Sequence, residues 1–414
     1  MTNTNLQVIK PVSKKERIKE LDIIRGFALF GVLLVNMAMF NSTLFIEAIE
    51  GSALSSPLEL TNFADKFGAF FIKIVGEGKF YTIFSFLFGL GFYIFMGRAE
   101  MKGFSSKKLF LRRSFFLLLF GVLHFSLVWY GDILHTYAII AFLLVCFRNK
   151  GLKSIKKWII ILLIVSTLLM SLGMLLNDLS SEALSPKTYK EQMDTMESLA
   201  KESINLYQDG SFFEIVRYRV TVEWPRMLMS LIVIIPKILA MFLIGLYVGK
   251  RKIFNDITGN MPLIKRTWKI GGIIGGIATV IYTFIELSII SIDPILSSGV
   301  VTFFKEIATV FLSLFYITSL ILLYRKNIFK KILNPLRYLG QMSLTNYLVQ
   351  CILCSLIFYG HGLGLINKIG ISVGILLTFV IYFSQIIISK LWLGKFRYGP
   401  FEWIWRRLTY GRRL

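Results

Sequence analysis

Long apolar segments separated by short polar connections recur along the whole chain. Most of them hold about twenty residues with few charges, the length at which an α-helix crosses the roughly 30 Å hydrocarbon core of a bilayer. We therefore predict an all-α, polytopic integral membrane protein with about ten membrane-spanning helices. These spans are placed near residues 23–43, 80–97, 111–130, 133–147, 157–176, 227–248, 269–291, 303–324, 338–359 and 369–390.

The connections alternate between strongly basic ones and ones that are acidic or poor in charge. With ten spans, every basic connection and both termini fall on the same side, which the positive-inside rule assigns to the cytoplasm. The basic blocks are Arg98/Lys102/Lys107/Lys108/Arg112/Arg113, Lys150/Lys153/Lys156/Lys157, Lys250/Arg251/Lys252 and Arg325/Lys326/Lys330/Lys331.

This topology divides the chain into a basic cytoplasmic leader, residues 1–21, a ten-helix transmembrane domain, residues 22–392, and a cytoplasmic tail, residues 393–414. The polar segment 177–224 is expected to be a long outer loop, which either caps a cavity that opens outward or is simply solvated. The amphipathic segment 62–75 is expected to lie along the outer interface or dip into it.

A formal net charge of +23 does not indicate nucleic-acid binding here, because the basic residues form short blocks between apolar segments instead of one soluble basic face. The expected partner of these blocks is the lipid bilayer, in particular its anionic lipids. All three cysteines lie in apolar segments, as buried thiols do, and no metal site is predicted.

The tail resembles a short amphipathic helix at the membrane surface (residues 397–414). Pro400 suits its first position, Glu402 its first turn and Arg406 its last turn. Trp403 and Trp405 suit the headgroup boundary. Two interpretations stay open: the helix is only an anchor in anionic lipid, or Glu402, Trp403 and Arg406 also contact a ligand.

Polar side chains also occur inside the first span. An ionisable group at membrane depth costs roughly 2.5–3.5 kcal/mol on insertion scales, so such groups usually face the bundle interior. Asp22, Arg25 and Asn36 fall on one face at 100° per residue, with Asn36 about 16 Å beyond Arg25. They are either a local ion pair and an interhelical amide bond, or the polar lining of a path through the bundle.

The second and sixth spans contain lysines, and the ninth contains a polar stripe. Lys79 either contacts a ligand or extends to the headgroups, and the deeper Lys237 is expected to extend likewise. Gly89 and Gly91, ten and twelve positions after Lys79, are expected to let helices pack closely. Four residues of the ninth span share one face and either bond neighbouring helices or line a cytoplasmic-side cavity: Ser343, Asn346, Tyr347 and Gln350.

Two of the three histidines lie close together, in the segment VLHFSLVWYGDILHTYAII (122–140). Asp132 lies between His124 and His135 and is well placed to cap the fourth span. We expect Asp132 to reach His124 only through water or a bound group, and the histidines not to touch. His124 is the predicted acid–base residue with Asp132 as its partner, and His135 a ligand contact; the alternative is a structural histidine.

Five motifs, spread along the chain, together resemble the bacterial YeiB-like multipass family, whose domain has no assigned function. These motifs are ELDIIRGFALFGVLLVNM, EGKFYTIFSFLFGLGF, LHFSLVWYGDILHTYA, GQMSLTNYLVQ and GPFEWIWRRLTYGRR.

A more distant similarity links the first span to the transmembrane acyltransferases, namely the family-3 acyltransferases and the heparan-α-glucosaminide N-acetyltransferase group. The shared element is Asp-x-x-Arg, here Asp22 and Arg25. The resemblance implies a ten-helix bundle that takes acyl-CoA from the cytoplasm and acylates an acceptor across the membrane. Asn36 stands where the family-3 enzymes carry their catalytic histidine, and residues 41–61 lack the histidine of the heparan-type enzymes. The base is therefore expected elsewhere, at His124 with Asp132.

The first hypothesis is accordingly an acyltransferase in the bacterial cytoplasmic membrane. It has no tightly bound cofactor, takes acyl-CoA as co-substrate and acts on a small-molecule or envelope-polymer acceptor. Arg25 and other basic residues would hold the CoA phosphates, and His124 would deprotonate the acceptor. The alternatives are a transporter or flippase, in which His124 couples protons, and a non-catalytic assembly or sensor protein. The oligomeric state stays open.

Overall fold

The computed structural model describes residues 17–43 and 62–411. In this part of the chain eight helical segments are long and apolar enough to cross a membrane. They are α1 (Lys19–Phe40), α3 (Phe63–Phe71) continued through a π-helical turn (Ile72–Gly76) into α4 (Lys79–Met101), α5 (Ser106–Leu127), α7 (Leu152–Ala183), α9 (Phe212–Tyr218) continued through a second π-helical turn (Arg219–Glu223) into α10 (Trp224–Lys250), α11 (Met261–Glu286), α12 (Pro294–Tyr324) and α16 (Ile371–Lys395).

Two shorter apolar helices occupy the places of the predicted fourth and ninth spans. They are α6 (Leu134–Leu144), extended by a 3₁₀ turn to Phe147, and α15 (Ser343–Phe358). The remaining described helices are α8 (Pro186–Asp209), α13 (Asn327–Leu333), α14 (Leu336–Gln341) and α17 (Pro400–Tyr410). The prediction of an all-α polytopic membrane protein is thus confirmed, with helices in the expected order.

The helices pack closely where glycines remove side chains from the contact. A Cβ at Gly89 of α4 would lie 1.9 Å from the carbonyl oxygen of Phe242, and a Cβ at Gly245 of α10 would lie 2.1 Å from that of Phe86. The backbones of α4 and α10 therefore touch directly, as expected for Gly89.

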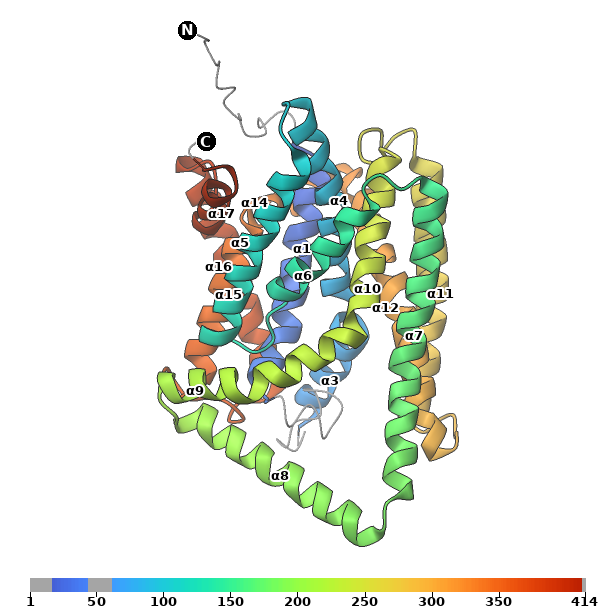
Figure 1. Cartoon of the computed structure of the whole chain (residues 1–414), viewed down its shortest axis with the longest axis vertical. Coiled ribbons are helices and arrows are strands. Elements are labelled where there is room, and N and C mark those ends of the chain that lie inside the picture. Colours follow the sequence, from blue (N-terminus) through green and yellow to red (C-terminus); the bar gives the residue numbers. More distant parts are fainter. Residues whose placement is uncertain (1–16, 44–61, 412–414) are drawn as a thin grey trace.

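The basic connections gather at one end of the bundle, which is called the basic end below. Lys250 Nζ donates to the carbonyl of Lys150 at 2.8 Å, and Arg325 Nη2 donates to Thr258 Oγ1 at 2.8 Å, so connections distant in sequence meet. Helix α17 and the start of α1 lie at this same end, whereas α8 and α9 lie at the opposite end (Figure 1).

The segment 177–224 is not an irregular loop. Helix α7 continues to Ala183, α8 crosses the opposite end of the molecule, and α9 leads back into α10 (Figure 1). Ser185 and Ser211 begin α8 and α9 by accepting hydrogen bonds from the backbone N–H groups of Thr188 and Glu214, and Pro186 fills the first position of α8.

Three lysines of the bundle form ion pairs with glutamates. Lys237 Nζ lies 2.8 Å from Glu306 Oε1, and its side chain is 2% exposed, so the expectation that it extends to the headgroups is wrong. The pairing is favoured because a buried ammonium without a carboxylate loses its hydration without compensation. Two further pairs join neighbouring helices near the opposite end: Lys305–Glu77 and Lys73–Glu286.

The basic connections predict which side of the membrane each end of the bundle faces. In a Cys146→Ser background, a cysteine at Asp194 of α8 is expected to react with a membrane-impermeant maleimide in intact cells, because the positive-inside rule assigns the basic end to the cytoplasm. A cysteine at Lys252 is the matched control and is expected to react only after permeabilisation. Both positions are exposed, so accessibility within the fold does not limit labelling. The reverse labelling pattern would invert the topology.

Candidate functional site

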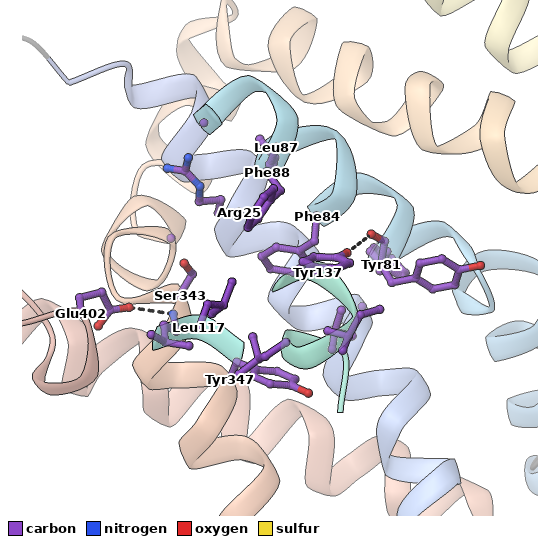
Figure 2. Close-up of a pocket in the computed structure, with 18 of the residues that line it drawn as sticks. Arg25, Tyr81, Phe84, Leu87, Phe88, Leu117, Tyr137, Ser343, Tyr347 and Glu402 are labelled. Atoms are coloured by element: carbon purple, nitrogen blue, oxygen red, sulfur yellow. Dashed lines mark hydrogen bonds between the residues drawn. The ribbon is translucent and has the colours of Figure 1, made fainter. Parts of the chain in front are cut away.

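A cavity of about 560 Å³ runs along the centre of the bundle from the basic end towards the opposite end. Its wall is built from α1, α4, α5, α6, α14, α15 and α17, so all five motif segments singled out in the sequence contribute to it. Figure 2 shows Arg25, Phe84 and Phe88 facing Leu117, Ser343 and Glu402 across this space.

Four arginines line the mouth of the cavity at the basic end: Arg17, Arg25, Arg113 and Arg406. The predicted pair of Asp22 with Arg25 forms, with Arg25 Nη1 3.1 Å from Asp22 Oδ1. The other carboxylate oxygen of Asp22 lies 2.8 Å from Arg17 Nε, so one buried carboxylate orients two arginines. The guanidinium groups keep donors that are not used by Asp22.

Arg113 and Trp405 join α5 to the C-terminal helix. The Arg113 guanidinium lies 3.5 Å from the centre of the Trp405 indole ring, and Trp405 Nε1 donates to the Arg113 carbonyl at 2.9 Å. A cation over an indole face is an attractive arrangement, stronger when water is excluded. Sequence reasoning assigned Arg113 to a basic connection and Trp405 to the headgroups; the signal that could have found Arg113 is its place inside an apolar helix.

Glu402 of α17 caps the N-terminus of α15. Its Oε1 accepts hydrogen bonds from the backbone N–H groups of Leu344 at 2.7 Å and Thr345 at 3.1 Å, and Oε2 accepts from Thr345 Oγ1 at 2.5 Å. Burial raises the pKa of Glu402, and these hydrogen bonds offset that effect only in part. The first N–H groups of a helix lack partners within it, so a carboxylate from another helix here fixes α17 against the cavity.

The interior of the cavity is mainly apolar and aromatic. Phe84, Phe88 and Leu117 line its middle. The Tyr137 hydroxyl is held inside this wall, because it donates to the Tyr81 carbonyl at 2.6 Å (Figure 2). Asn36 and Glu77 add polar groups further from the mouth. A ligand that fills the cavity therefore meets cations first and an apolar wall after them.

Asp132 binds both neighbouring histidines directly. Its Oδ1 lies 2.8 Å from His124 Nδ1, and its Oδ2 lies 2.8 Å from His135 Nδ1 and accepts the His135 backbone N–H at 2.9 Å. The expectation that Asp132 reaches His124 only through water is wrong, whereas the predicted capping bond at the start of α6 forms.

The contact arises because the chain turns back immediately after α5. The N–H groups of Val128 and Trp129 both donate to the His124 carbonyl. In addition, a Cβ at Gly121 would lie only 2.2 Å from the backbone nitrogen of His135, so α6 begins against the side of α5. A turn followed by ideal helices, which the sequence suggested, would have left Asp132 too far above His124.

Ionisation of Asp132 determines which ring nitrogen of each histidine carries a hydrogen. Burial raises the pKa of the Asp132 carboxyl, but the hydrogen bonds from His124 and His135 outweigh burial and lower this pKa to about 2. An ionised carboxylate only accepts, so Nδ1 of each ring carries a hydrogen. His135 Nε2 then meets Thr136 Oγ1 at 3.2 Å, whereas the buried His124 Nε2 has no partner among the residues that the structure describes.

Neither histidine lines the cavity itself. Tyr347 does, and the centre of its ring lies 5.3 Å from the centre of the His124 ring, so the imidazole lies one side chain behind the cavity wall. Among the described residues the buried Tyr347 hydroxyl has no hydrogen-bond partner either. Tyr347 is therefore the side chain of the cavity wall whose ring packs against His124.

The remaining predicted site residues divide between the cavity and other contacts. Ser343 and Tyr347 face the cavity. Asn346, which shares their predicted stripe, instead donates to Ser389 Oγ of α16 at 3.0 Å. Lys79 is buried and donates to the Lys73 carbonyl at 3.0 Å, and Trp403 is 49% exposed; neither lines the cavity.

The cap on α15 can be tested by mutation. Glu402→Ala leaves two backbone N–H groups of α15 without their acceptor, which costs about 1–2 kcal/mol. We expect faster trypsin cleavage after Arg406 and Arg407, followed by mass spectrometry of the released peptides, because α17 detaches more often. Glu402→Gln is the matched control, since its amide oxygen still accepts from the backbone N–H groups and its amide nitrogen can donate to Thr345 Oγ1, which reverses that one hydrogen bond. Equal cleavage rates for the Ala and Gln variants would contradict the capping role.

Comparison with known proteins agrees with the resemblance noted in the motifs. Residues 248–412 match the family described as "Protein of unknown function (DUF418)". The chain is 33% identical to the uncharacterized protein YxaH of Bacillus subtilis, with 97% of this chain and 96% of that protein covered. It is 27% identical to the uncharacterized protein YeiB of Escherichia coli, with 95% and 96% covered. No solved structure matches the chain. The chain therefore belongs to the YeiB-like family of uncharacterized proteins that carry the DUF418 domain.

Proposed function

We propose that the protein is an acyltransferase of the bacterial cytoplasmic membrane. It takes acyl-CoA at the basic end and transfers the acyl group to a hydroxyl or amine of a cell-envelope acceptor. The observation that carries the proposal is the cavity, whose arginine-lined mouth leads into an apolar interior. An acyl-CoA has the same order of parts, with phosphates at one end followed by a flexible arm and an acyl group.

The mouth suits the phosphates of the donor. The mouth holds four arginines and two carboxylates, Asp22 and Glu402, so positive groups are in excess. Both carboxylates are already hydrogen-bonded to protein groups. Guanidinium groups bind phosphate oxygens through two parallel hydrogen bonds, and these bonds are stronger than neutral ones. Arg25 and Arg406, both predicted ligand contacts, are joined here by Arg17 and Arg113.

His124 is the proposed general base. Its Nε2 takes the proton of the acceptor hydroxyl or amine while the acceptor oxygen or nitrogen attacks the thioester carbonyl. The new ester or amide bond forms, the carbon–sulfur bond breaks, and the CoA thiolate leaves and takes up the proton from His124. Asp132 stabilises the imidazolium formed in between, as a carboxylate on Nδ1 does in other acyl-transfer sites. Tyr347 has to rotate away from His124 for the acceptor to reach Nε2.

The same cavity could serve a transporter or flippase, and the two functions differ in their product. An acyltransferase releases free CoA and an acylated acceptor, whereas a transporter returns its ligand chemically unchanged on the other side. Incubation of proteoliposomes with radiolabelled acyl-CoA and an envelope extract separates the two. Release of free CoA with label in the extract supports transfer, and movement of intact ligand supports transport.

The arginine mouth makes a prediction about binding. Arg25→Ala is expected to weaken acyl-CoA binding by about tenfold or more, because a charge-assisted contact to phosphate is lost. Arg25→Lys should restore it only in part, since an ammonium does not replace a two-pronged guanidinium. Calorimetry on the purified protein in nanodiscs gives the affinities. Exposed Arg251→Ala is the control. Unchanged affinity in Arg25→Ala would remove Arg25 from the donor site.

The histidine pair offers a matched test of the base. Asn at 124 or 135 keeps an N–H that can donate to Asp132 but has no basic nitrogen. His124→Asn is expected to lower the rate of acyl transfer by about 10²–10⁴-fold. His135→Asn should stay within a few-fold of the parent, because His135 Nε2 is hydrogen-bonded to Thr136 Oγ1 and His135 does not line the cavity. Equal loss in both variants, with unchanged thermal melting, would count against His124 as the base.

A further inference from the structure

One face of α4 forms an aromatic wall with a gap in it. Phe84, Phe88, Gly91 and Phe95 follow at intervals of four, three and four residues, so they share a face of the helix, and all four line the cavity. Three of these positions carry a phenyl ring, whereas position 91 carries no side chain.

The two glycines of this helix have opposite roles. Gly89 is needed for packing, because its Cβ would lie 1.9 Å from the Phe242 carbonyl oxygen. A Cβ at Gly91 would meet no heavy atom of residues 17–43 and 62–411 within 4 Å. The expectation that Gly91 allows a helix to pack closely is therefore wrong. Because Gly91 lines the cavity, the space above it belongs to the cavity and not to a neighbouring helix.

The gap lies between the arginine mouth and the apolar interior. On the mouth side, Phe95 is covered by the Arg113 guanidinium, 5.2 Å from the ring centre. On the interior side, Phe88 stacks on Phe242 at 4.5 Å and meets Tyr137 edge-on at 5.7 Å, so its ring is fixed. A chain that runs from the mouth into the interior has to pass between these two rings, across Gly91.

We infer that Gly91 is the entrance of an apolar channel for an alkyl or acyl chain whose anionic end is held by the mouth arginines. The channel makes Gly91 a specificity-determining position, since any side chain there occupies the space that the chain needs. The ligand class is thus an amphiphile with a phosphate at one end and an unbranched apolar chain. Only its identity as an acyl-CoA rests on the proposed function.

Soluble alkyl phosphates test the channel without assuming acyl transfer. Calorimetry on protein in nanodiscs, with empty nanodiscs subtracted, measures the Kd of ethyl, butyl, hexyl and octyl phosphate. In the parent, each methylene that enters the channel is expected to tighten binding by about fourfold. Gly91→Leu should bind ethyl phosphate with the Kd of the parent, but its Kd should not fall as the alkyl chain lengthens. Gly91→Ala should show a smaller fall in Kd per methylene than the parent.

Gly97→Leu is the matched control. Gly97 lies on the same helix, and a Cβ there also meets no heavy atom within 4 Å, but Gly97 does not line the cavity. The control should keep the full chain-length dependence. The same dependence in Gly91→Leu as in the parent, equal loss in Gly97→Leu, or no chain-length dependence in the parent would each overturn the inference. If alkyl phosphates behave as expected and acyl-CoA does not bind, the channel stands and the proposed acyltransferase function fails.

Discussion

The cost of an uncompensated charge inside an apolar bundle governs where the polar groups of this protein lie. A buried ion loses its hydration and has to recover that energy from partners within the protein. Lys237 pairs with Glu306 and Lys305 pairs with Glu77. Asp132 is shared by two histidines, which also ties the start of α6 to α5. The mouth is different, because its arginines outnumber the carboxylates beside them, and an anionic ligand would restore the balance.

The sequence predicted the fold better than the site, for physical reasons. Apolar length and charge alternation are properties of single helices, so the spans could be placed from the pattern alone. The site depends on how helices face one another. Ser343 and Asn346 lie on one predicted stripe, yet α15 packs against both the cavity and α16, and the stripe divides between them. Likewise, only the docking of α17 decides that Trp405 faces the cavity while Trp403 stays exposed.

The contacts within the histidine cluster could not be predicted from the sequence either, although these residues lie close together in the chain. His124, Asp132 and His135 were grouped correctly from their spacing, but their contact depends on irregular backbone between α5 and α6. Two N–H groups converge on one carbonyl there, and Gly121 lets the helices touch. Patterns of residue type do not encode such a turn. The two glycines of α4 also show that residue type does not determine surroundings. Gly89 faces the backbone of a neighbouring helix, whereas Gly91 faces open space.

The capping of α15 by Glu402 also orders events during biosynthesis. Helix α15 leaves the ribosome more than forty residues before Glu402 does, so its first N–H groups enter the membrane region without their final acceptor. Trp405 and Arg406 arrive later still, and both belong to the wall of the mouth. The arginine-lined end of the cavity is therefore completed only after the helices that precede α17 have been synthesised. The mouth of the cavity is thus complete only once α17 has been made and has docked on the N-terminus of α15.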